Sequence, residues 1–341
     1  MLTHTHGARV LLAAAAISFA AIATSCVQKD DAQLVVYAYD SFASEWGPGP
    51  IVIPAFEKAT GITVELVVPG DAGQVLARAV DEKRSPRADV IVGIDGNLLP
   101  KALAAGVLAA YEPKGSASVP ARLRLDDDWR LTPYDWSSFC VMWDSEKLAV
   151  PPASLEDLTK PEYGRKLILM DPRTSTPGLG FVEWTAAIYG DGLSGYWKRL
   201  APSILTLSPG WDTGYGLFTA GEAPLVISYT TSAAYHAEYE TAGRYKALEF
   251  ADGHPIQVEG AGIVVGARHR EAAEAFIDFM LGDEFQAALP LTNWMYPVNE
   301  GVVLPPSYEA SKKPAKTVSA GLAPNQLDEA VRTALDALQG R

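Results

Sequence analysis

Three stretches near the start of the chain decide its fold: LVVYAYDSFASEWGPGPIVIPAFEK (34–58), GITVELVVPGDAGQVLARAVDEK (61–83) and ADVIVGIDGN (88–97). Each contains a short apolar run, rich in valine and isoleucine, with the length and composition of a buried strand. These strands are expected at residues 34–39, 62–68 and 88–94. Helical signals separate them, and such an alternation of strands and helices predicts a parallel sheet with right-handed crossovers.

Capping residues mark where the helices begin and end. Gly61 stands where a helix over 48–58 needs a left-handed cap. Asp71 can accept hydrogen bonds from the free N–H groups of a helix that runs to about residue 83. Asn97 opens a further helix after the third strand.

Polar residues follow the first and third strands, at the carboxyl ends where ligands of parallel sheets bind. Tyr39, Asp40 and Ser41 follow the first strand, and Asp95 follows the third. The two carboxylates could neutralise a positive ring or accept from an amine. They could equally cap the helices that come next, and the sequence leaves both interpretations open.

A second unit begins after the apolar run 139–143, which predicts a strand that crosses from one lobe to the other. Further strands are expected at 166–170 and 225–229, and a strand at 260–266 returns to the first unit. Helices are expected at 271–281 and 328–338. The division is therefore 34–136 plus about 250–292 for lobe 1, and 137–249 plus about 293–341 for lobe 2.

Composition limits the class of protein. Among the 341 residues, 28 are Lys or Arg and 41 are Asp or Glu, which gives a net charge of −13. Nucleic acid is excluded as a partner, because it demands a basic face. The acidic balance suits a cationic ligand, although solubility alone also explains it. With only two cysteines, a disulfide framework is excluded.

The first residues have the pattern of an export signal rather than of the fold. Arg9 precedes an Ala-rich apolar run at 10–23, which is typical of a signal peptide over 1–25. The run ends in Ala-Thr-Ser-Cys (23–26), which resembles a bacterial lipobox, although Ala23 stands where Leu is usual. We expect an exported, periplasmic protein that is lipid-anchored through Cys26, with 26–33 as a tether. The alternative is ordinary cleavage and a soluble product.

Hydroxyl groups gather at two expected helix starts in the second unit. Ser175 and Thr176 precede Pro177, and Thr230 stands in Thr-Thr-Ser (230–232) after a strand. Free N–H groups and the helix dipole at such ends favour anions, which predicts a phosphate site. Plain N-capping is the alternative for each residue taken singly.

Four aromatic residues stand in polar or glycine-containing surroundings rather than in apolar periodic runs: Trp211, Tyr229, Tyr235 and Trp294. Such rings can stack on a flat ligand or face a cation, at about 0.5–2 kcal/mol for each cation–aromatic contact. The alternative is core packing. Together with the carboxylates and the anion-binding helix starts, they describe a flat, cationic and sometimes phosphorylated ligand.

Five motifs resemble those of the thiamine-binding periplasmic proteins of bacterial ABC importers. They are YDSF (39–42), WGPGP (46–50), DPRTSTPGLG (171–180), SYTTS (228–232) and NWMYPV (293–298). The resemblance covers about residues 34–298. It implies an α/β, two-lobed type II periplasmic-binding-protein fold with a central ligand cleft, related to ferric-ion-binding proteins and to thiaminase I.

The resemblance also implies roles for individual residues. Tyr39 would pack on the aminopyrimidine of thiamine with Asp95 nearby, the aromatic residues of the second lobe would line the cleft, and Trp294 would close it. The expected thiamine-binding set is Tyr39, Asp40, Trp46, Asp95, Trp211, Tyr229, Tyr235, Asn293 and Trp294. The expected phosphate-binding set is Ser175, Thr176 and Thr230.

The function implied is capture of thiamine and its mono- and diphosphates, for delivery to the membrane permease and ATPase of an ABC importer. No cofactor, no metal and no catalysis are expected, and the protein is expected to be a monomer. The sequence does not rank the three forms of the ligand.

Two other functions stay open. A thiaminase-like enzyme would need Cys140 as its nucleophile, but the run Phe-Cys-Val-Met-Trp (139–143) would keep that thiol protonated. Ferric-ion binding would use Tyr229, Tyr235 and His236, although five residues separate the two tyrosines.

Overall fold

The computed structural model describes residues 33–239 and 243–340, and its first half has the predicted βαβαβ order. Strand β1 (Gln33–Tyr37) pairs in parallel with β2 (Thr63–Val67) and with β3 (Val90–Asp95). Helices α2 (Gly49–Thr60) and α3 (Ala72–Asp81) connect these strands. The mixed α/β fold class predicted from the sequence is thus confirmed.

The capping residues act as the sequence predicts, with one difference. Gly61 ends α2 with φ 74°, and its N–H donates to Glu57 O. Asp71 forms a capping box at the start of α3 with Gln74. Helix α4 (Leu99–Ala105) begins two residues after Asn97, because Asp95 accepts from the backbone N–H groups that precede the helix.

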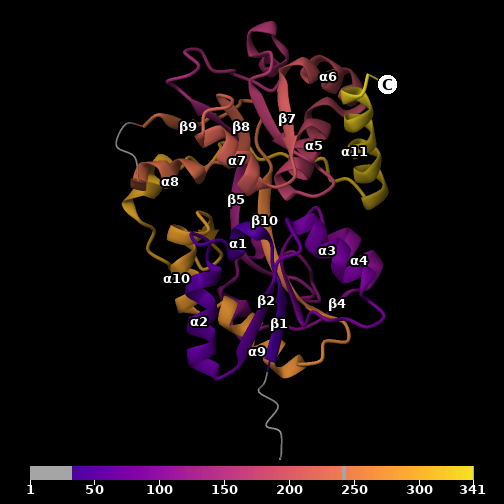
Figure 1. Ribbon diagram of the computed structural model, residues 1–341, viewed down its shortest axis with the longest axis vertical. Helices are drawn as coiled ribbons and strands as arrows, with labels where there is room; N and C mark the ends of the chain where they lie inside the picture. Colours follow the sequence, from indigo (N-terminus) through magenta and orange to yellow (C-terminus); the bar gives the residue numbers. More distant parts are fainter. Residues whose placement is uncertain (1–32, 240–242, 341) are drawn as a thin grey trace, which may run out of the picture. The chain divides into compact units, whose positions relative to one another are not determined.

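A long strand, β5 (Thr132–Asp144), belongs to both halves of the fold. Its first part pairs with β10 (Ile256–Val264), and its second part pairs with β8 (Leu225–Tyr229) and β9 (Tyr245–Ala247). Beyond β8 lie β6 (Leu167–Met170) and β7 (Ile204–Ser208). The order β2-β1-β3-β10-β5-β8-β6-β7 is therefore continuous through β5, rather than two separate sheets (Figure 1).

The remaining elements cover these strands. The α-helices are α1 (Asp40–Ala43), α5 (Thr176–Tyr189), α6 (Leu193–Leu200), α7 (Trp211–Thr219), α8 (Ser232–Tyr239), α9 (Arg270–Met280), α10 (Asp283–Thr292) and α11 (Pro324–Leu338). Two short strands are β4 (Leu108–Ala109) and β11 (Tyr296–Pro297). Single 3₁₀ turns lie at Ser116–Ser118, Ala121–Leu123, Asp157–Thr159, Pro161–Tyr163, Gly190–Gly192, Ala201–Ser203 and Pro306–Ala310.

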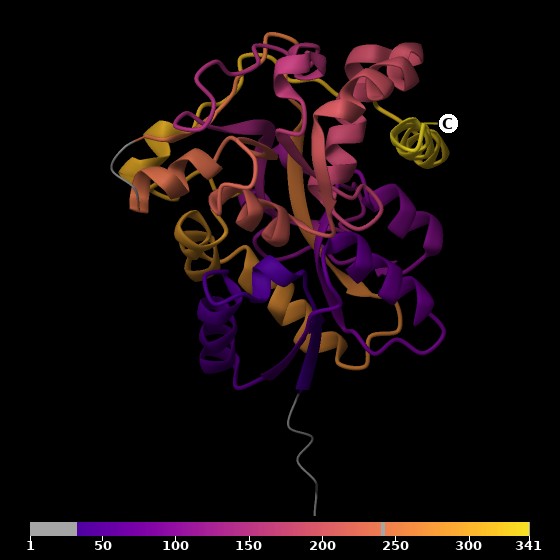
Figure 2. The same cartoon turned by 45° about the horizontal axis from the view of Figure 1, so that its top comes forward.

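The described residues form two large hydrophobic cores, with a third, smaller cluster around Trp136, Trp294 and Tyr296. One packs β1, β3 and β10 against α2, α3 and α9, and the other packs β5, β6 and β8 against α5 and α6. Figures 1 and 2 show these halves, with the C-terminal α11 beside α5 and α6. Strand β11 pairs with the first part of β5, the part that also pairs with β10, although the sequence division placed it in lobe 2. The lobe boundaries stay a prediction.

Three predicted segments lie outside the described residues: the signal peptide, nearly all of the tether, and the lipidation site at Cys26. Within the described ranges, no helix is both long enough and apolar enough to cross a membrane.

Candidate functional site

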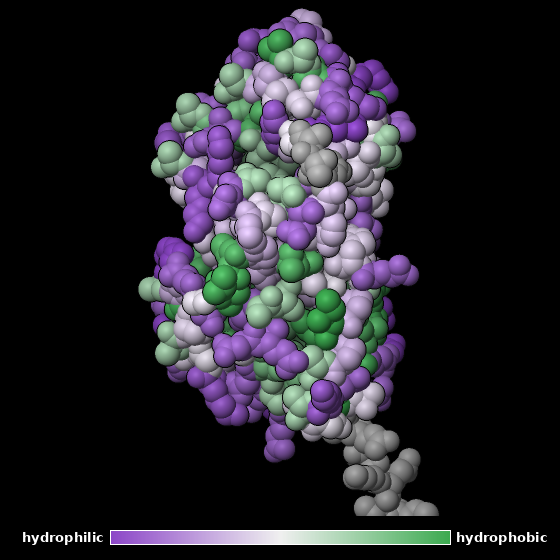
Figure 3. Space-filling view, turned by 90° about the vertical axis from the view of Figure 1, so that its left-hand side faces the viewer, coloured by the Kyte–Doolittle hydropathy of each residue, from purple (hydrophilic) through white to green (hydrophobic). Residues whose placement is uncertain are grey.

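A cavity of about 230 Å³ lies where residues of both cores meet. It is lined by the segment after β1, by the N-terminal ends of α3, α5, α7 and α8, by β10 and by the segment after α10. The carboxyl end of β1 and the starts of several helices thus meet at one place, as expected for an α/β fold. Figure 3 views the side on which α2, α8 and α10 lie, where apolar side chains gather at mid-height between hydrophilic ends.

One wall of the cavity is aromatic and belongs to α7. Trp211, the first residue of this helix, stacks on Tyr215 with ring centroids 4.7 Å apart and an interplanar angle of 16°. Trp46 lies beside it at 5.8 Å. The Trp211 indole N–H donates to Ser228 Oγ at 2.8 Å, which fixes the ring orientation. The aromatic wall therefore presents a flat ring whose orientation is fixed.

A second aromatic pair closes another side. Tyr235 of α8 meets Trp294 edge to face, with centroids 5.3 Å apart and an angle of 80°. Trp294 has φ 54°, a left-handed conformation that is rare for a bulky residue and that clusters at functional sites. Its indole is 8 % exposed. The segment that follows α10 therefore holds this ring in place at a conformational cost.

Tyr39 forms part of the floor, and a glycine makes room for it. Gly93 in β3 has φ 95°, and a Cβ there would lie 2.2 Å from Tyr39 Cδ1. The Tyr39 hydroxyl lies 3.0 Å from Glu259 Oε2 and 3.1 Å from Asn293 Oδ1. Burial, together with the charges of Glu259 and Asp135, raises the pKa of this phenol well above its ordinary value, so it is a neutral donor.

Three carboxylates line the cavity: Asp71, Asp212 and Glu259. No lysine, arginine or histidine is among the described residues that line it. Desolvation by burial raises the pKa of Glu259 to about 7, against the hydrogen bonds from Tyr134 and Tyr39, which lower it. The cavity thus has aromatic walls and acidic groups without a basic partner, a combination that suits a flat cation.

One of these acids, Asp71, is hydrogen-bonded to the start of α7, the helix that carries Asp212. Asp71 Oδ1 accepts from Ala72 N at 2.7 Å, and Asp71 Oδ2 accepts from Trp211 N at 3.2 Å. One carboxylate of the first half therefore joins the N-termini of α3 and α7, where the helix dipoles favour negative charge. Desolvation nevertheless raises the pKa of Asp71 to about 6, and the neighbouring Asp40 adds to it. Desolvation and the charge of Asp40 also raise the pKa of Asp212.

The predicted phosphate residues have different surroundings. Thr176 lines the cavity. Ser175 is buried without a hydrogen bond of normal geometry, although it lies close enough to Asp71 to lower the pKa of that carboxyl. The Thr230 hydroxyl lies against Ser137, away from the cavity, and Ser232 lines the cavity instead.

Of the twelve predicted ligand residues, eight line the cavity: Tyr39, Trp46, Thr176, Trp211, Tyr229, Tyr235, Asn293 and Trp294. Four do not: Asp40, Asp95, Ser175 and Thr230. Asp95 accepts from the N–H groups of Asn97 and Leu98 before α4, in line with the capping interpretation. Asp40 is the first residue of α1 and accepts only from Ser41 N, so it does not cap that helix. Which residues contact a ligand stays a prediction.

The predicted ligand residues leave out several lining residues, above all Asp71, Asp212, Tyr215 and Glu259. The position of Asp71 between a strand and a helix indicates only a cap. Glu259 carried a usable signal, because a charged residue inside the apolar strand IQVEGAGIV (256–264) is unusual for a buried strand.

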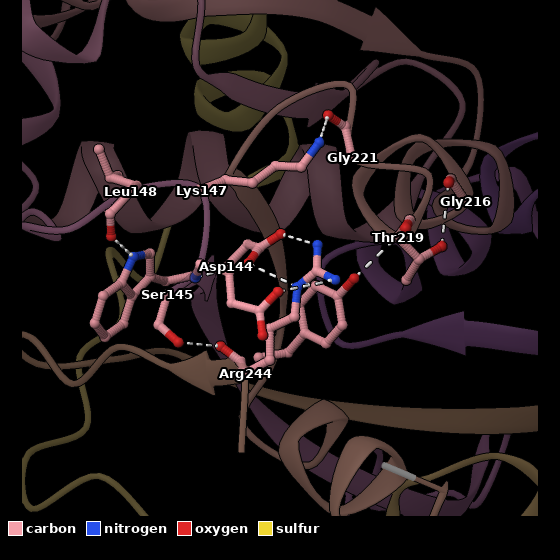
Figure 4. Close-up of polar contacts among 11 residues, drawn as sticks. Asp144, Ser145, Lys147, Leu148, Gly216, Thr219, Gly221 and Arg244 are labelled. Carbon is pink, nitrogen blue, oxygen red and sulfur yellow. Dashed lines mark hydrogen bonds and ion pairs between the residues drawn. The ribbon is translucent and has the colours of Figure 1, made fainter. Parts of the chain in front are cut away.

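A polar network in the second half holds the far end of α7, as Figure 4 shows. Arg244 donates to both carboxylate oxygens of the buried Asp144, at 2.9 and 2.5 Å. Lys147 Nζ donates to Gly221 O at 2.5 Å, just beyond α7. Within α7, the Thr219 hydroxyl donates to Gly216 O at 3.1 Å, and both residues line the cavity. Pairing of charges therefore fixes the end of β5 beside the wall that α7 forms.

The structure also shows where the residues required by the enzyme and ferric-ion hypotheses lie. Cys140 is fully buried in β5 and does not line the cavity, and burial raises the pKa of its thiol. The His236 ring lies 2.8 Å from the Tyr215 hydroxyl. In the part of the chain that the structure describes, no group of three or more His, Cys, Asp or Glu is arranged to hold a metal ion.

Two hydrophobic cores bridged by β5 and β10, with an aromatic and acidic cavity between them, define a two-lobed solute-binding protein. The family model for bacterial extracellular solute-binding proteins matches residues 52–317. The chain belongs to this family.

Its relatives narrow the class further. The chain is 42 % identical over 305 residues to the thiamine-binding periplasmic protein of Brucella melitensis, which covers 88 % of this chain and 90 % of that protein. It is 42 % identical over 286 residues to the protein of the same name from Escherichia coli K12, covering 84 % and 86 %. A solved periplasmic thiamin binding protein superposes with a TM-score of 0.84 at 38 % identity, covering 90 % and 96 %.

Proposed function

We propose that this protein captures thiamine outside the cytoplasm and delivers it to an ABC importer. One observation carries the proposal: the cavity combines aromatic walls with three carboxylates and has no basic side chain among its described lining residues. Thiamine joins a flat aminopyrimidine to a thiazolium ring with a fixed positive charge. The names of the relatives agree with this ligand.

The aromatic residues and the carboxylates of the cavity have different roles in binding. Trp211, stacked on Tyr215 and held by Ser228, offers a face to one ring of the ligand, and the Tyr235–Trp294 pair offers edges to the other. The carboxylates balance the thiazolium charge, which costs them little because the cavity is already shielded from water. Closure of the two lobes around the ligand would exclude the remaining solvent.

Calorimetric titration with thiamine tests the proposal. Trp211→Ala and Trp294→Ala should each weaken binding by about 1–3 kcal/mol, roughly 5- to 150-fold, the usual range for buried aromatic contacts. Trp197→Phe, a change in the core of the second half, serves as the control for altered folding. Saturating thiamine should also raise the melting temperature, because it binds only the native state. No heat of binding and no melting shift would exclude thiamine as the ligand.

Phosphorylated forms of thiamine are part of the same proposal. Ser175 has a buried hydroxyl at the start of α5 next to Thr176, which faces the cavity. Ser175→Ala should weaken thiamine monophosphate by about 1.5–3 kcal/mol, the value of a hydrogen bond to a charged group, and leave thiamine nearly unchanged. Equal losses for both ligands would show that Ser175 only supports the helix start.

Anchoring is the remaining element of the proposal. Lipid on Cys26 would hold the exported protein at the membrane beside the permease and ATPase that it supplies. Cys26→Ala should move the protein from the membrane fraction to the soluble fraction. Identical fractionation of wild type and variant as soluble protein would exclude the lipid anchor.

The proposal treats the protein as a binding protein without catalysis. The buried Cys140 thiol supports this, because it lies outside the cavity and is held in its unreactive protonated form. Thiamine incubated with the protein should be recovered intact, and stoichiometric release of the pyrimidine would reverse this assignment.

A further inference from the structure

Three neighbouring strands place a carboxylate at the same level beside the cavity. Glu259 of β10 pairs with Asp95 of β3 on one side and with Asp135 of β5 on the other. Adjacent strands lie about 4.8 Å apart, and residues directly opposite in antiparallel pairs share a face of the sheet. The three side chains, called the acid row below, are buried, and the most exposed of them, Glu259, is only 6 % exposed. Glu259 alone lines the cavity.

The acid row has only neutral hydrogen-bond donors. Glu259 Oε2 accepts from Tyr39 and Tyr134, and Glu259 Oε1 accepts from Gln257 at 2.6 Å. Asp135 Oδ2 accepts from Asn293 at 2.5 Å.

Two oxygens of the row, Asp95 Oδ2 and Asp135 Oδ1, are buried without any partner. No ion pair between residues of the described ranges includes a member of the row.

The other titratable groups that act on the row are acids and phenols from every element around it. They are Tyr39 after β1, Asp71 before α3, Tyr134 of β5, Glu183 of α5 and Tyr229 of β8. Three adjacent carboxylates cannot all ionise in such surroundings without a large cost, because burial and mutual repulsion both oppose it. Desolvation accordingly raises the pKa of Asp95 and of Glu259 to about 7, and that of Asp135 well above its ordinary value. The row therefore holds protons at neutral pH.

We propose that the acid row is a proton-exchanging charge sensor, in which the cation of an entering ligand displaces a proton from Glu259 to the solvent. The step balances: the protonated carboxyl of Glu259 loses H⁺ to the buffer, and the carboxylate that remains pairs with the ligand's positive ring. No covalent bond to the ligand forms or breaks. The inference rests on the proposed function and adds the means by which the cavity distinguishes a cation from a neutral ring.

The sign of the pH dependence follows from this exchange. The ligand's charge favours the ionised carboxyl, so the pKa of Glu259 is lower in the complex than in the empty cavity. Binding then releases protons and strengthens as the pH rises towards 7, and it levels off above that value. Each proton fully displaced changes the dissociation constant by about tenfold per pH unit.

Calorimetric titration with thiamine in phosphate and in Tris at pH 6.5 and 8.5 tests the inference. These pairs of buffers differ in their heats of ionisation, so the difference in observed heat counts the protons released. We expect net release at pH 6.5 and almost none at pH 8.5. Thiamine that binds equally well at both pH values, with heats independent of the buffer, would overturn the sensor and leave the proposed function standing. Absence of thiamine binding in either buffer would overturn both.

Variants separate the sensor from a structural role. Glu259→Gln should remove the proton release and flatten the pH profile. Asp95→Asn, which does not change the cavity lining, removes an acid whose charge raises the pKa of Glu259 and should move the midpoint of the profile to lower pH. Glu271→Gln on the exposed surface of α9 makes the same charge change far from the row and should leave the profile as in wild type. Asp95→Asn with an unshifted midpoint would contradict the coupling within the row.

Discussion

The two ends of strand β5 carry buried aspartates with opposite surroundings. At one end, Asp144 receives both hydrogen bonds of the Arg244 guanidinium, with further backbone donors from Glu146 and Lys147. Near the other end, Asp135 has one neutral donor and an unpaired oxygen, and Glu259 lies beside it. The same strand therefore carries a buried acid with a cationic partner in one half of the protein and a buried acid without one in the other.

The pKa values respond in opposite directions. Desolvation raises the pKa of Asp144, but the hydrogen bonds and charge of Arg244 outweigh it and the net shift is downward. For Asp135, desolvation and the charge of Glu259 both act upward. The cost of burying Asp144 is thus offset by Arg244, within the chain. The cost of burying the acids at the cavity is not offset within the chain, so a cationic ligand that offsets it gains binding free energy.

The largest expected effect concerns stability against pH in the ligand-free protein. Glu259 has its pKa raised from 4.5 to about 7, so its contribution to stability is present at pH 4.5 and lost as the pH rises through 7. The loss is roughly 3 kcal/mol, because a tenfold change in a proton-binding constant corresponds to about 1.4 kcal/mol. Asp144 contributes in the other direction, since its lowered pKa gives stability that disappears only below pH 3.8.

Urea unfolding of the ligand-free protein at pH 5 and pH 8 measures this difference, and the protein should be more stable at pH 5. In Glu259→Gln the difference should shrink, because this carboxyl then no longer titrates between these values. A difference in stability between pH 5 and pH 8 that is unchanged in Glu259→Gln would refute the contrast between the two ends of β5.

The second prediction concerns the loss of Arg244, the cationic partner of Asp144. Arg244→Ala leaves Asp144 buried without its cation and should cost about 2 kcal/mol of unfolding free energy, less than the roughly 3–5 kcal/mol of a fully buried pair because Arg244 is partly exposed. Thiamine affinity should keep its pH profile. Arg199→Ala breaks an exposed pair with Glu156 and is the control, with an expected loss of about 0.5 kcal/mol. Equal losses in the two variants would mean that Asp144 is effectively solvated.

The third prediction supplies the cation that the cavity lacks. Gln257 donates to Glu259 Oε1, so Gln257→Lys would place an ammonium beside the row and make it resemble the Asp144–Arg244 pair. Thiamine should then bind about tenfold more weakly, equivalent to about 1.4 kcal/mol, because the introduced ammonium already balances the charge of Glu259. Gln257→Met removes the same donor without adding charge and separates the two effects. If Gln257→Lys bound thiamine as tightly as Gln257→Met, charge compensation by the ligand would be excluded.

Much of the fold, and eight of the nineteen residues that line the cavity, could be predicted from the sequence. The capping residues Gly61 and Asp71 and the strand runs at 34–39 and 62–68 predict α2, α3, β1 and β2 within one to three residues at each boundary. Aromatic residues in polar surroundings, such as Trp211 and Trp294, can be recognised as cavity residues. They do not belong to an apolar periodic pattern, which would indicate a place in the core.

Residues with two chemically sensible roles are harder to assign. Asp95 and Asp71 both follow a strand and precede a helix, and either could cap or face a ligand. The structure makes Asp95 a cap behind the cavity and gives Asp71 a place on the lining as well as a cap on two helices. A capping pattern defines the backbone partner of the carboxylate, but it does not define the direction of the second oxygen.

The sequence by itself determined the α/β alternation, the acidic charge and the family motifs, because these depend on composition and on neighbours along the chain. Only the tertiary structure decided that Asp95, Glu259 and Asp135 form one row, since 40 and 124 positions separate neighbouring members in sequence. Pairing across β3, β10 and β5 brings them together and excludes water and basic side chains from them. The pKa of a carboxyl depends on those spatial neighbours, which no local pattern encodes.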